Sequence, residues 1–271
     1  MNTHRMCIHI IAVVLFSFLS FIATVPAAAP PLTCDDASTP CLLGEQLPFS
    51  IGERCTYLIK MNIFNMTVGK LDLYLKEITT IRGHECYHVT GDIIPTGAIV
   101  KSMNYYAHEY FDEYFDTTTF EVIRIVTIKT ESTLTNKVRI DVYPEKKEFH
   151  YKDHQYDFTK KYEYKLLGMM TMIYAVRVVR LNDTDHIRCS LLNGYNVEPI
   201  DAIVSYEGKI RTIAFNERSD VITVRHNAFG EQAIWLLDDD RRIPVRMKTI
   251  PIEVYLFGKV NLYLWLVKYS Q

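Results

Sequence analysis

Residues 70–76, KLDLYLK, place a leucine at every second position, between polar or aromatic side chains. This period of two is typical of a β-strand that turns one face to a core and the other to water. The alternation returns at residues 137–143 (KVRIDVY), and after the turn PEKK it resumes at residues 149–152 (FHYK). Residues 137–152 are therefore predicted to form a β-hairpin.

Two further segments share the strand pattern. Aromatic and β-branched residues crowd residues 105–130, which predicts two long strands with a turn near residues 116–119. Near the carboxyl end, one face of a predicted strand carries Val260, Leu262, Leu264 and Leu266, and the other carries Asn261, Tyr263 and Trp265. The fold class expected from these patterns is mainly β, an antiparallel β-roll or open barrel-like sheet.

Residues 166–181, LLGMMTMIYAVRVVRL, break the alternation. Apolar side chains recur there at spacings of three and four, and Asn182 and Asp183 supply a stop signal. We expect one substantial helix here, packed on the sheet or filling the end of a rolled one. Gly168 and the β-branched valines of this segment lower its helix propensity.

The amino-terminal residues 1–29 have the three parts of a secretory signal peptide. Arg5 closes a basic start, residues 8–25 are almost entirely apolar, and the small-residue run PAAA follows at 26–29. An uncleaved anchor is the alternative, because the apolar stretch approaches the ~20 residues that cross a bilayer. We expect residues 30–47 to form an extended Pro-rich leader and residues 48–271 a single β-rich domain.

Five cysteines remain after the signal peptide. In an oxidising compartment Cys34 and Cys41 are a candidate disulfide that would close a small loop in the leader. Cys55, Cys86 and Cys189 are interpreted as small buried apolar residues.

Composition and motifs argue against several functions. Basic and acidic residues nearly balance, at 30 and 32, with no long run of one sign, so neither nucleic acid nor an anionic membrane surface is indicated as a partner. Phosphate-loop, dinucleotide and Cys-x-x-Cys motifs do not occur. Four residues of strand span ~13 Å, so the pairs His84/His88 and His150/His154 are too far apart to share a metal. We expect no cofactor and no metal.

A polar cluster at residues 238–248 (DDDRRIPVRMK) is the densest in the chain. Its interpretation as an anion-holding or acid/base site competes with that of a solvated turn, in which Asp bonds its own backbone. The aromatic residues could line an apolar cavity or simply pair across strands. The candidate ligand-binding residues are Tyr110, Tyr114, Trp235, Asp239, Arg242, Arg246 and Trp265.

Several segments together resemble a bacterial exported family catalogued as domain of unknown function 3108. The opening PFSIGER at residues 48–54, with Tyr57 and the VGK at 68–70, is similar to the start of that family, and WLLDDDRRIPVRMK at 235–248 is similar to its closing motif. Between them, YFD at 114–116 and YAVR at 174–177 follow in the family's order. Residues 165–168 (KLLG) depart from it, where relatives tend to show Asp or Ser.

The resemblance covers nearly all of the mature chain and implies a β-rich rolled or barrel-like sheet in a Gram-negative envelope protein. It implies no reaction, because the family has no established one. Localisation to the periplasm or outer cell envelope is the corresponding expectation.

The function favoured by the sequence is a non-catalytic binding or carrier protein for a lipid or other apolar or amphipathic small molecule. A curved sheet with aromatic-rich strands can enclose such a ligand. One alternative is a hydrolase-like enzyme that uses Asp239 or Asp240 with Arg242 and a histidine such as His226, which requires these groups to meet in one cleft. Another is an envelope scaffold that binds a protein partner by a sheet edge.

Overall fold

The computed structural model describes residues 47–63, 65–97, 107–131, 133–179, 181, 186–192, 198–212, 217–226, 230–249, 252–254 and 258–271. The predicted signal peptide at 1–29, nearly all of the leader at 30–47 and the candidate disulfide Cys34–Cys41 lie outside these residues.

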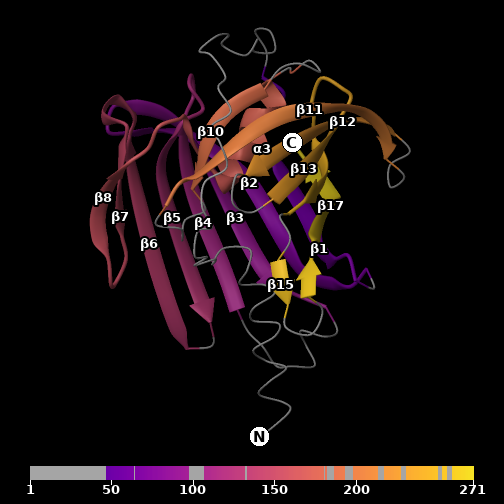
Figure 1. The fold of residues 1–271 in the computed structure, drawn as a ribbon, viewed down its shortest axis with the longest axis horizontal. Coiled ribbons are helices and arrows are strands. Elements are labelled where there is room, and N and C mark those ends of the chain that lie inside the picture. Colours follow the sequence, from indigo (N-terminus) through magenta and orange to yellow (C-terminus); the bar gives the residue numbers. More distant parts are fainter. Residues whose placement is uncertain are drawn as a thin grey trace, which may run out of the picture.

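Eight strands form the first arm of a large sheet, each antiparallel to the next (Figure 1). They are β1 (Arg54–Met61), β2 (Thr67–Ile81), β3 (His84–Pro95), β4 (Ala107–Asp116), β5 (Val122–Glu131), β6 (Leu134–Tyr143), β7 (Glu148–Lys152) and β8 (Asp157–Lys161). The three expectations for this arm are confirmed: KLDLYLK lies in β2, residues 105–130 contain β4 and β5, and residues 137–152 contain the β6–β7 hairpin, which a 3-10 turn at Pro144–Lys146 connects.

The second arm is built from the carboxyl-terminal half. It contains β9 (Leu166–Gly168), β10 (His186–Leu192), β11 (Ile200–Thr212), β12 (Glu217–His226), β13 (Gly230–Leu237), β14 (Pro244–Lys248) and β17 (Leu262–Ser270). Only the β9–β10 pair is parallel in this arm. A separate two-stranded sheet pairs β15 (Ile252–Val254) with β16 (Gly258–Val260).

The two arms join because β1 pairs with β17, so that one sheet runs in the order β8 to β1, then β17, β14, β13, β12, β11, β10 and β9. The end strands β8 and β9 do not pair with each other, which leaves the sheet open. The predicted open, barrel-like and mainly antiparallel sheet with one substantial helix is confirmed. Both end strands are short, and β8 carries Lys160 and Lys161, features that hinder pairing with another chain.

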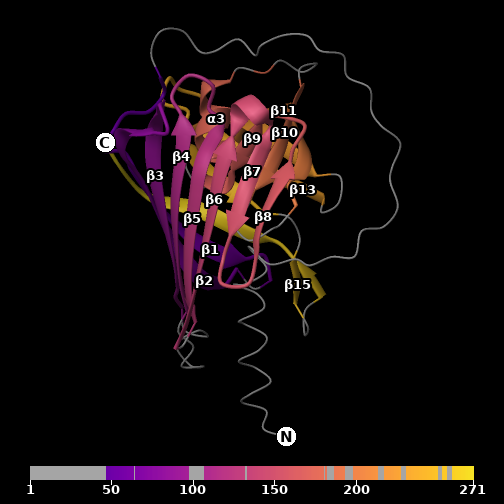
Figure 2. The same ribbon diagram turned by 90° about the vertical axis from the view of Figure 1, so that its left-hand side faces the viewer.

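The helix α3 (Met169–Val178) lies between the two arms, on the inner face of the curved sheet (Figures 1 and 2). One continuous core joins it to both arms. Examples are Tyr57 and Phe111 from the first arm, Val224 and Leu264 from the second, and Tyr174 from the helix. The sheet therefore wraps the helix.

The helix is shorter than the predicted 166–181. Leu166 and Leu167 instead form β9, Gly168 occupies the N-cap position with an extended backbone, and Val179 ends the helix. The valines explain the early end, since β-branched side chains favour extended backbone. Gly168 precedes the helix and does not lie inside it.

Pro244 has no backbone N–H to donate to a neighbouring strand, so the sequence predicts an edge strand or an irregular strand at this position. The prediction of an edge strand is wrong, because β14 lies between β13 and β17 in the interior of the sheet. The irregularity is confirmed, because the pairing of β13 with β14 shifts register beside Pro244. A proline is tolerated there as the first residue of its strand, next to a bulge.

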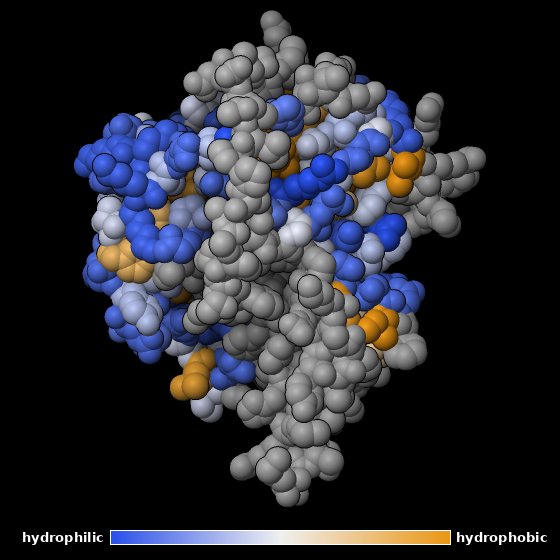
Figure 3. All heavy atoms as spheres, in the orientation of Figure 1, coloured by the Kyte–Doolittle hydropathy of each residue, from blue (hydrophilic) through white to orange (hydrophobic). Residues whose placement is uncertain are grey.

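The outer face of the sheet is mostly polar. The coloured residues in Figure 3 are mostly hydrophilic, and exposed large apolar residues such as Leu134, Tyr156 and Val267 are scattered over β6, the β7–β8 turn and β17. A smaller apolar cluster on the outer side of β13 and β14 includes Trp235 and Val245. No helix in the described part of the chain is long and apolar enough to cross a bilayer.

Candidate functional site

A cavity of about 130 Å³ lies between α3 and the inner faces of β10, β11 and β12. Its walls are apolar. They are formed by Leu167, Ala175, Val176, Val178, Val179, Leu181, Ile187, Cys189, Val204 and Ile222, and the β4–β5 turn adds Phe120. None of these wall residues is charged, so an apolar group that enters the cavity would not bury an unpaired charge.

The solvent side of the cavity is marked by Thr118, Thr119 and Lys165, whose side chains are exposed. Lys165 makes no ion pair with any other described residue. The cavity thus combines apolar walls with hydroxyl groups and one cation at its mouth, an arrangement suited to an amphipathic molecule.

The β4–β5 turn holds its position through Asp116. One carboxylate oxygen of Asp116 accepts hydrogen bonds from the backbone N–H of Thr118 and of Thr119, at 3.0 and 2.8 Å. Phe120 follows with a left-handed backbone (φ 58°) and its ring packs on Phe49 and Phe115. These contacts fix the two threonines at the mouth.

Cys189 lines the cavity and carries a thiol, but its surroundings keep this thiol protonated and therefore unreactive. Burial raises the pKa of its thiol to about 12. Cys55 and Cys86 are also buried free thiols, with pKa values of about 12 and 11 for the same reason. The interpretation of these three cysteines as small buried apolar residues is confirmed, since a nucleophilic cysteine needs a lowered pKa.

The helix wall of the cavity is anchored at its first turn by Glu113, from the inner face of β4. The carboxylate Oε2 of Glu113 accepts hydrogen bonds from the N–H and the hydroxyl of Thr171, at 2.8 and 2.9 Å. A Cβ at residue 168 would lie 2.3 Å from the same oxygen, so only glycine fits. The sheet supplies the N-terminal cap that the helix sequence lacks.

The last turn of α3 is anchored by Arg242. Its guanidinium donates to the carbonyl oxygens of Val179 at 3.2 Å and Val176 at 3.5 Å, and pairs with Asp220 at 2.8 Å. Arg177, on the helix itself, pairs with Glu53 of the segment before β1 at 2.5 Å, and both side chains are almost fully buried. Arg177 also donates to the carbonyl oxygens of Pro48 and Arg241.

Three of the segments that carry the family resemblance therefore meet at α3. Glu53 comes from PFSIGER, Arg177 from YAVR, and Arg242 from WLLDDDRRIPVRMK. Their contacts hold the helix against the sheet, and we infer that these motifs specify the fold around the cavity.

The seven candidate ligand-binding residues do not line this cavity. Tyr110 and Tyr114 point to the outer face of β4, where Tyr110 donates to Asp112 and Tyr114 stacks on His88. Trp235 and Trp265 also face outward, and they contact the guanidinium of Arg246 with centroid distances of 4.6 and 4.5 Å. Ligand binding by the seven residues stays a prediction. Five of them form two separate groups on the outer face: Tyr110 and Tyr114 on β4, and Trp235, Arg246 and Trp265 on β13, β14 and β17.

Asp239 lies in the β13–β14 turn. One oxygen accepts hydrogen bonds from the backbone N–H of Arg241 and Arg242, and the other pairs with the Arg241 side chain. This is the turn interpretation of the 238–248 cluster. Arg242 differs from its neighbours because its side chain turns inward to the helix.

The groups required for a hydrolase do not meet. His226 pairs with Gly230 at one end of the β12–β13 hairpin, whereas Asp239 and Asp240 follow β13 at the other end. Six residues of strand separate His226 from Asp220, the partner of Arg242, which is ~20 Å at ~3.3 Å per residue. Burial lowers the pKa of His226, which keeps the ring neutral in the sheet.

The fold and the cavity define an open, mainly antiparallel β-sheet protein that wraps one helix. The chain belongs to the family described as "Protein of unknown function (DUF3108)", whose model matches residues 56–264. A comparison with curated proteins finds no match.

Among solved structures, the chain is similar to a β-barrel-like protein of domain of unknown function DUF1849 from Brucella abortus. The TM-score is 0.54 at 10% sequence identity, over 81% of this chain and 97% of that one. At this identity the likeness concerns the fold alone.

Proposed function

We propose that this protein is an exported cell-envelope protein that binds the apolar part of an amphipathic ligand in the cavity beside α3, without catalysing a reaction. The cavity carries the proposal: its walls are apolar on every element that contributes to them, and its polar groups gather at the mouth.

The size of the cavity limits the occupant. A dry apolar cavity of ~150 Å³ accepts a molecule as large as benzene, so the volume here suits a small ring or a short length of acyl chain. Burial of six methylene groups contributes ~5 kcal/mol at ~0.8 kcal/mol each, which corresponds to a dissociation constant of about 0.1–1 mM. Tighter binding therefore needs the polar end of the ligand.

Lys165 is suited to hold that polar end. Lys165 is exposed and belongs to the cavity lining, and an anionic head group that reaches its ammonium group would form a charge-assisted hydrogen bond. A fatty acid or a similar anionic amphiphile is the ligand class that fits both the walls and the mouth.

Displacement of a small apolar probe tests the binding site. We expect fluorobenzene, followed by fluorine NMR, to bind the purified protein and a medium-chain fatty acid to displace it. Ala175→Leu fills the cavity from the helix and should weaken probe binding by about tenfold or more, whereas Ala175→Ser at the same place leaves the space open and should change it by less than about threefold. Equal binding by both variants would place the probe elsewhere and refute the proposal.

Export is tested separately. The signal-like residues 1–29 support secretion into the periplasm or outer envelope, as does the family resemblance. The full chain and a chain without residues 1–29 are expressed in a Gram-negative cell and fractionated by osmotic shock. We expect the full chain in the released fraction and the shortened chain in the cytoplasm. Retention of both forms in the cytoplasm would contradict export.

A further inference from the structure

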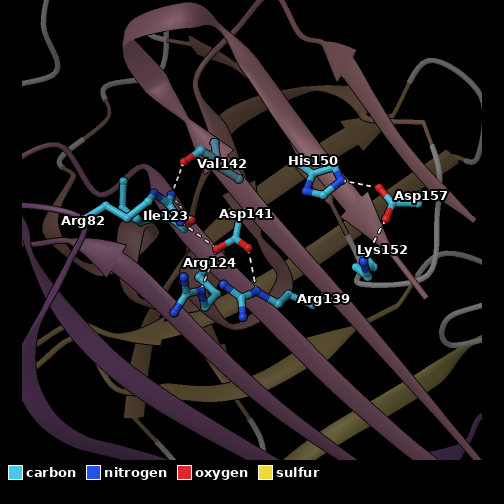
Figure 4. Close-up of polar contacts among 9 residues, drawn as sticks. All are labelled: Arg82, Ile123, Arg124, Arg139, Asp141, Val142, His150, Lys152 and Asp157. Atoms are coloured by element: carbon cyan, nitrogen blue, oxygen red, sulfur yellow. Dashed lines mark hydrogen bonds and ion pairs between the residues drawn. The ribbon is translucent and has the colours of Figure 1, made fainter. Parts of the chain in front are cut away.

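Three arginines converge on one aspartate on the outer face of the first arm, the face opposite to the one that carries the helix. Asp141 of β6 accepts hydrogen bonds from Arg82 at 2.6 Å, Arg124 at 2.7 Å and Arg139 at 2.6 Å. Figure 4 shows Arg124 and Arg139 beside one another on one side of the carboxylate. We name this group the Asp141 cluster.

The cluster carries more positive than negative charge. Three guanidinium groups surround one carboxylate, which leaves two positive charges without a partner among the described residues. Nearby Asp157 is already shared by His150 and Lys152 and does not compensate them (Figure 4).

The three arginines differ in what they have left to donate. Arg82 makes the most bonds within the protein, since its Nη1 donates to Asp141 and its Nη2 donates to the carbonyl oxygens of Ile123 and Val142. Arg124 and Arg139 give only Nε to Asp141, which leaves the Nη1/Nη2 edge of each guanidinium without a partner in the described part of the chain. The side chain of Arg124 is 21% exposed and that of Arg139 is 49% exposed, so both arginines are partly accessible to solvent.

Asp141 also orders these edges in advance. Its two oxygens are bonded to Arg124 Nε and Arg139 Nε separately, and its own side chain is only 10% exposed. A guanidinium whose Nε is already hydrogen-bonded has fewer side-chain conformations to lose when an anion binds at its other edge. This preorganisation lowers the entropic cost of anion binding.

We propose that the Asp141 cluster binds a phosphate group through the free edges of Arg124 and Arg139. Two uncompensated positive charges match the charge of about −1.5 to −2 of a phosphate monoester at pH 7. Each planar guanidinium edge can donate two parallel hydrogen bonds to phosphate oxygens. The phosphate can belong to a lipid head group or to a soluble molecule, and the site is independent of the cavity function.

Two assays on the purified chain distinguish these sources. Calorimetric titration with inorganic phosphate and with pyrophosphate measures binding of a free anion. Flotation with phosphatidylcholine vesicles, with and without 20% phosphatidic acid (about one lipid in five, chosen to supply phosphate monoesters), measures binding to a head group. We expect saturable binding in at least one assay, weakened as salt concentration rises.

Arg139→Gln removes one free edge and leaves Asp141 bonded to Arg82 and Arg124. It should weaken phosphate binding by about tenfold or more. Arg225→Gln is the matched control, because Arg225 is an exposed arginine of β12 that pairs with Glu207 and Glu231 and its loss changes the net charge equally. Arg139→Lys, which keeps the charge but not the planar edge, should bind with intermediate strength.

Binding that falls in Arg139→Gln and persists in Arg225→Gln supports the proposal, and the assay in which it occurs names the source. Absence of saturable binding in both assays, or an equal loss in the two glutamine variants, would overturn it. Thermal unfolding of each variant separates a lost site from a lost fold.

Discussion

The carboxylate of Glu113 occupies the space that a side chain at residue 168 would need. A Cβ there would approach Oε2 to 2.3 Å and the carboxyl carbon to 2.6 Å, and Glu113 cannot retreat because it is buried and bonded to Thr171. Glycine is therefore required at residue 168 because Glu113 of β4 leaves no room for a Cβ. The backbone does not require it, since any residue can adopt its φ of −83°.

Gly168→Ala should lower the free energy of unfolding by ~1–3 kcal/mol, the usual cost of forcing atoms into a filled interior. Urea denaturation followed by tryptophan fluorescence measures it. Gly91→Ala is the control: its added Cβ would meet only the end of the flexible Met170 side chain, at 3.2 Å, and we expect a smaller loss. Equal effects would argue against the contact between Gly168 and Glu113.

Glu113 also predicts a pH dependence. Burial raises the pKa of this carboxyl, and the N–H groups of Thr171 and Met170 oppose the rise without cancelling it. The folded protein therefore holds the proton more tightly than the unfolded chain. The stabilisation from this group is fully present below its unfolded pKa of ~4.3 and is lost as pH rises through the folded value.

Glu113→Gln keeps an acceptor oxygen at the helix end but does not titrate. The difference in unfolding free energy, wild type minus Glu113→Gln, should fall as pH is raised from about 4.5 to 8. Denaturation curves of the two proteins at matched pH give this difference, in which other titrating groups cancel. A difference that stays flat or grows with pH would contradict a raised pKa for Glu113.

At the scale of elements, α3 is held by charged groups from the sheet at both of its ends. It has no side-chain cap of its own, and it is ten residues long, too short to be stable alone in water. Glu113 lies at its amino end, where the helix dipole favours a negative charge, and Arg242 lies at its carboxyl end, where a positive charge is favoured. The helix is therefore a product of the fold around it.

Substitution of the two neighbouring arginines, Arg241 and Arg242, distinguishes the anchoring of the helix from the effect of removing a surface charge. Arg242→Met removes the donor from two helix carbonyls and the closest cation from Asp220, which keeps only the longer contacts with Tyr206 and Lys209, and should cost ~3–5 kcal/mol of unfolding free energy. Arg241→Met breaks an exposed pair with Asp239 and should cost at most ~1 kcal/mol. Chemical denaturation of both variants checks the contrast, and similar losses would show that Arg242 does not anchor the helix.

The elements were predictable to the extent that their causes are local. Alternation in β2 and β6 reports directly that one face is buried, so these strands could be read from the chain. The ends of α3 could not, because the groups that set them, Glu113 and Arg242, lie 58 and 66 residues away from their partners Thr171 and Val176. Tertiary contacts override propensity at both ends.

At the scale of the whole molecule, the sheet is open and the helix fills the space inside its curve. The pairing of β1 with β17 joins the two arms. The continuous sheet around the core therefore depends on hydrogen bonds between strands about 200 residues apart in the sequence. The cavity arises where α3 does not fill the space against the second arm.

This origin explains why the site was not found from the sequence. Its walls come from one helix and the segment after it, four strands and a turn, each contributing one to three ordinary apolar residues such as Val176, Val204 and Ile222. The conspicuous residues, Trp235, Arg246 and Trp265, are directly paired across β13, β14 and β17 on the outer face. The one available signal was the segment 166–181, whose loss of alternation marks the helix that forms the cavity wall.

The central claim is that an apolar cavity remains between α3 and the inner faces of β10–β12. Xenon binds such cavities, so a crystal of the protein exposed to xenon gas tests it most directly. We predict an anomalous peak surrounded by Val176, Val204 and Ile222, with α3 inside the sheet. A helix on the outside of the sheet, or a space filled by side chains without a xenon peak, would contradict the account.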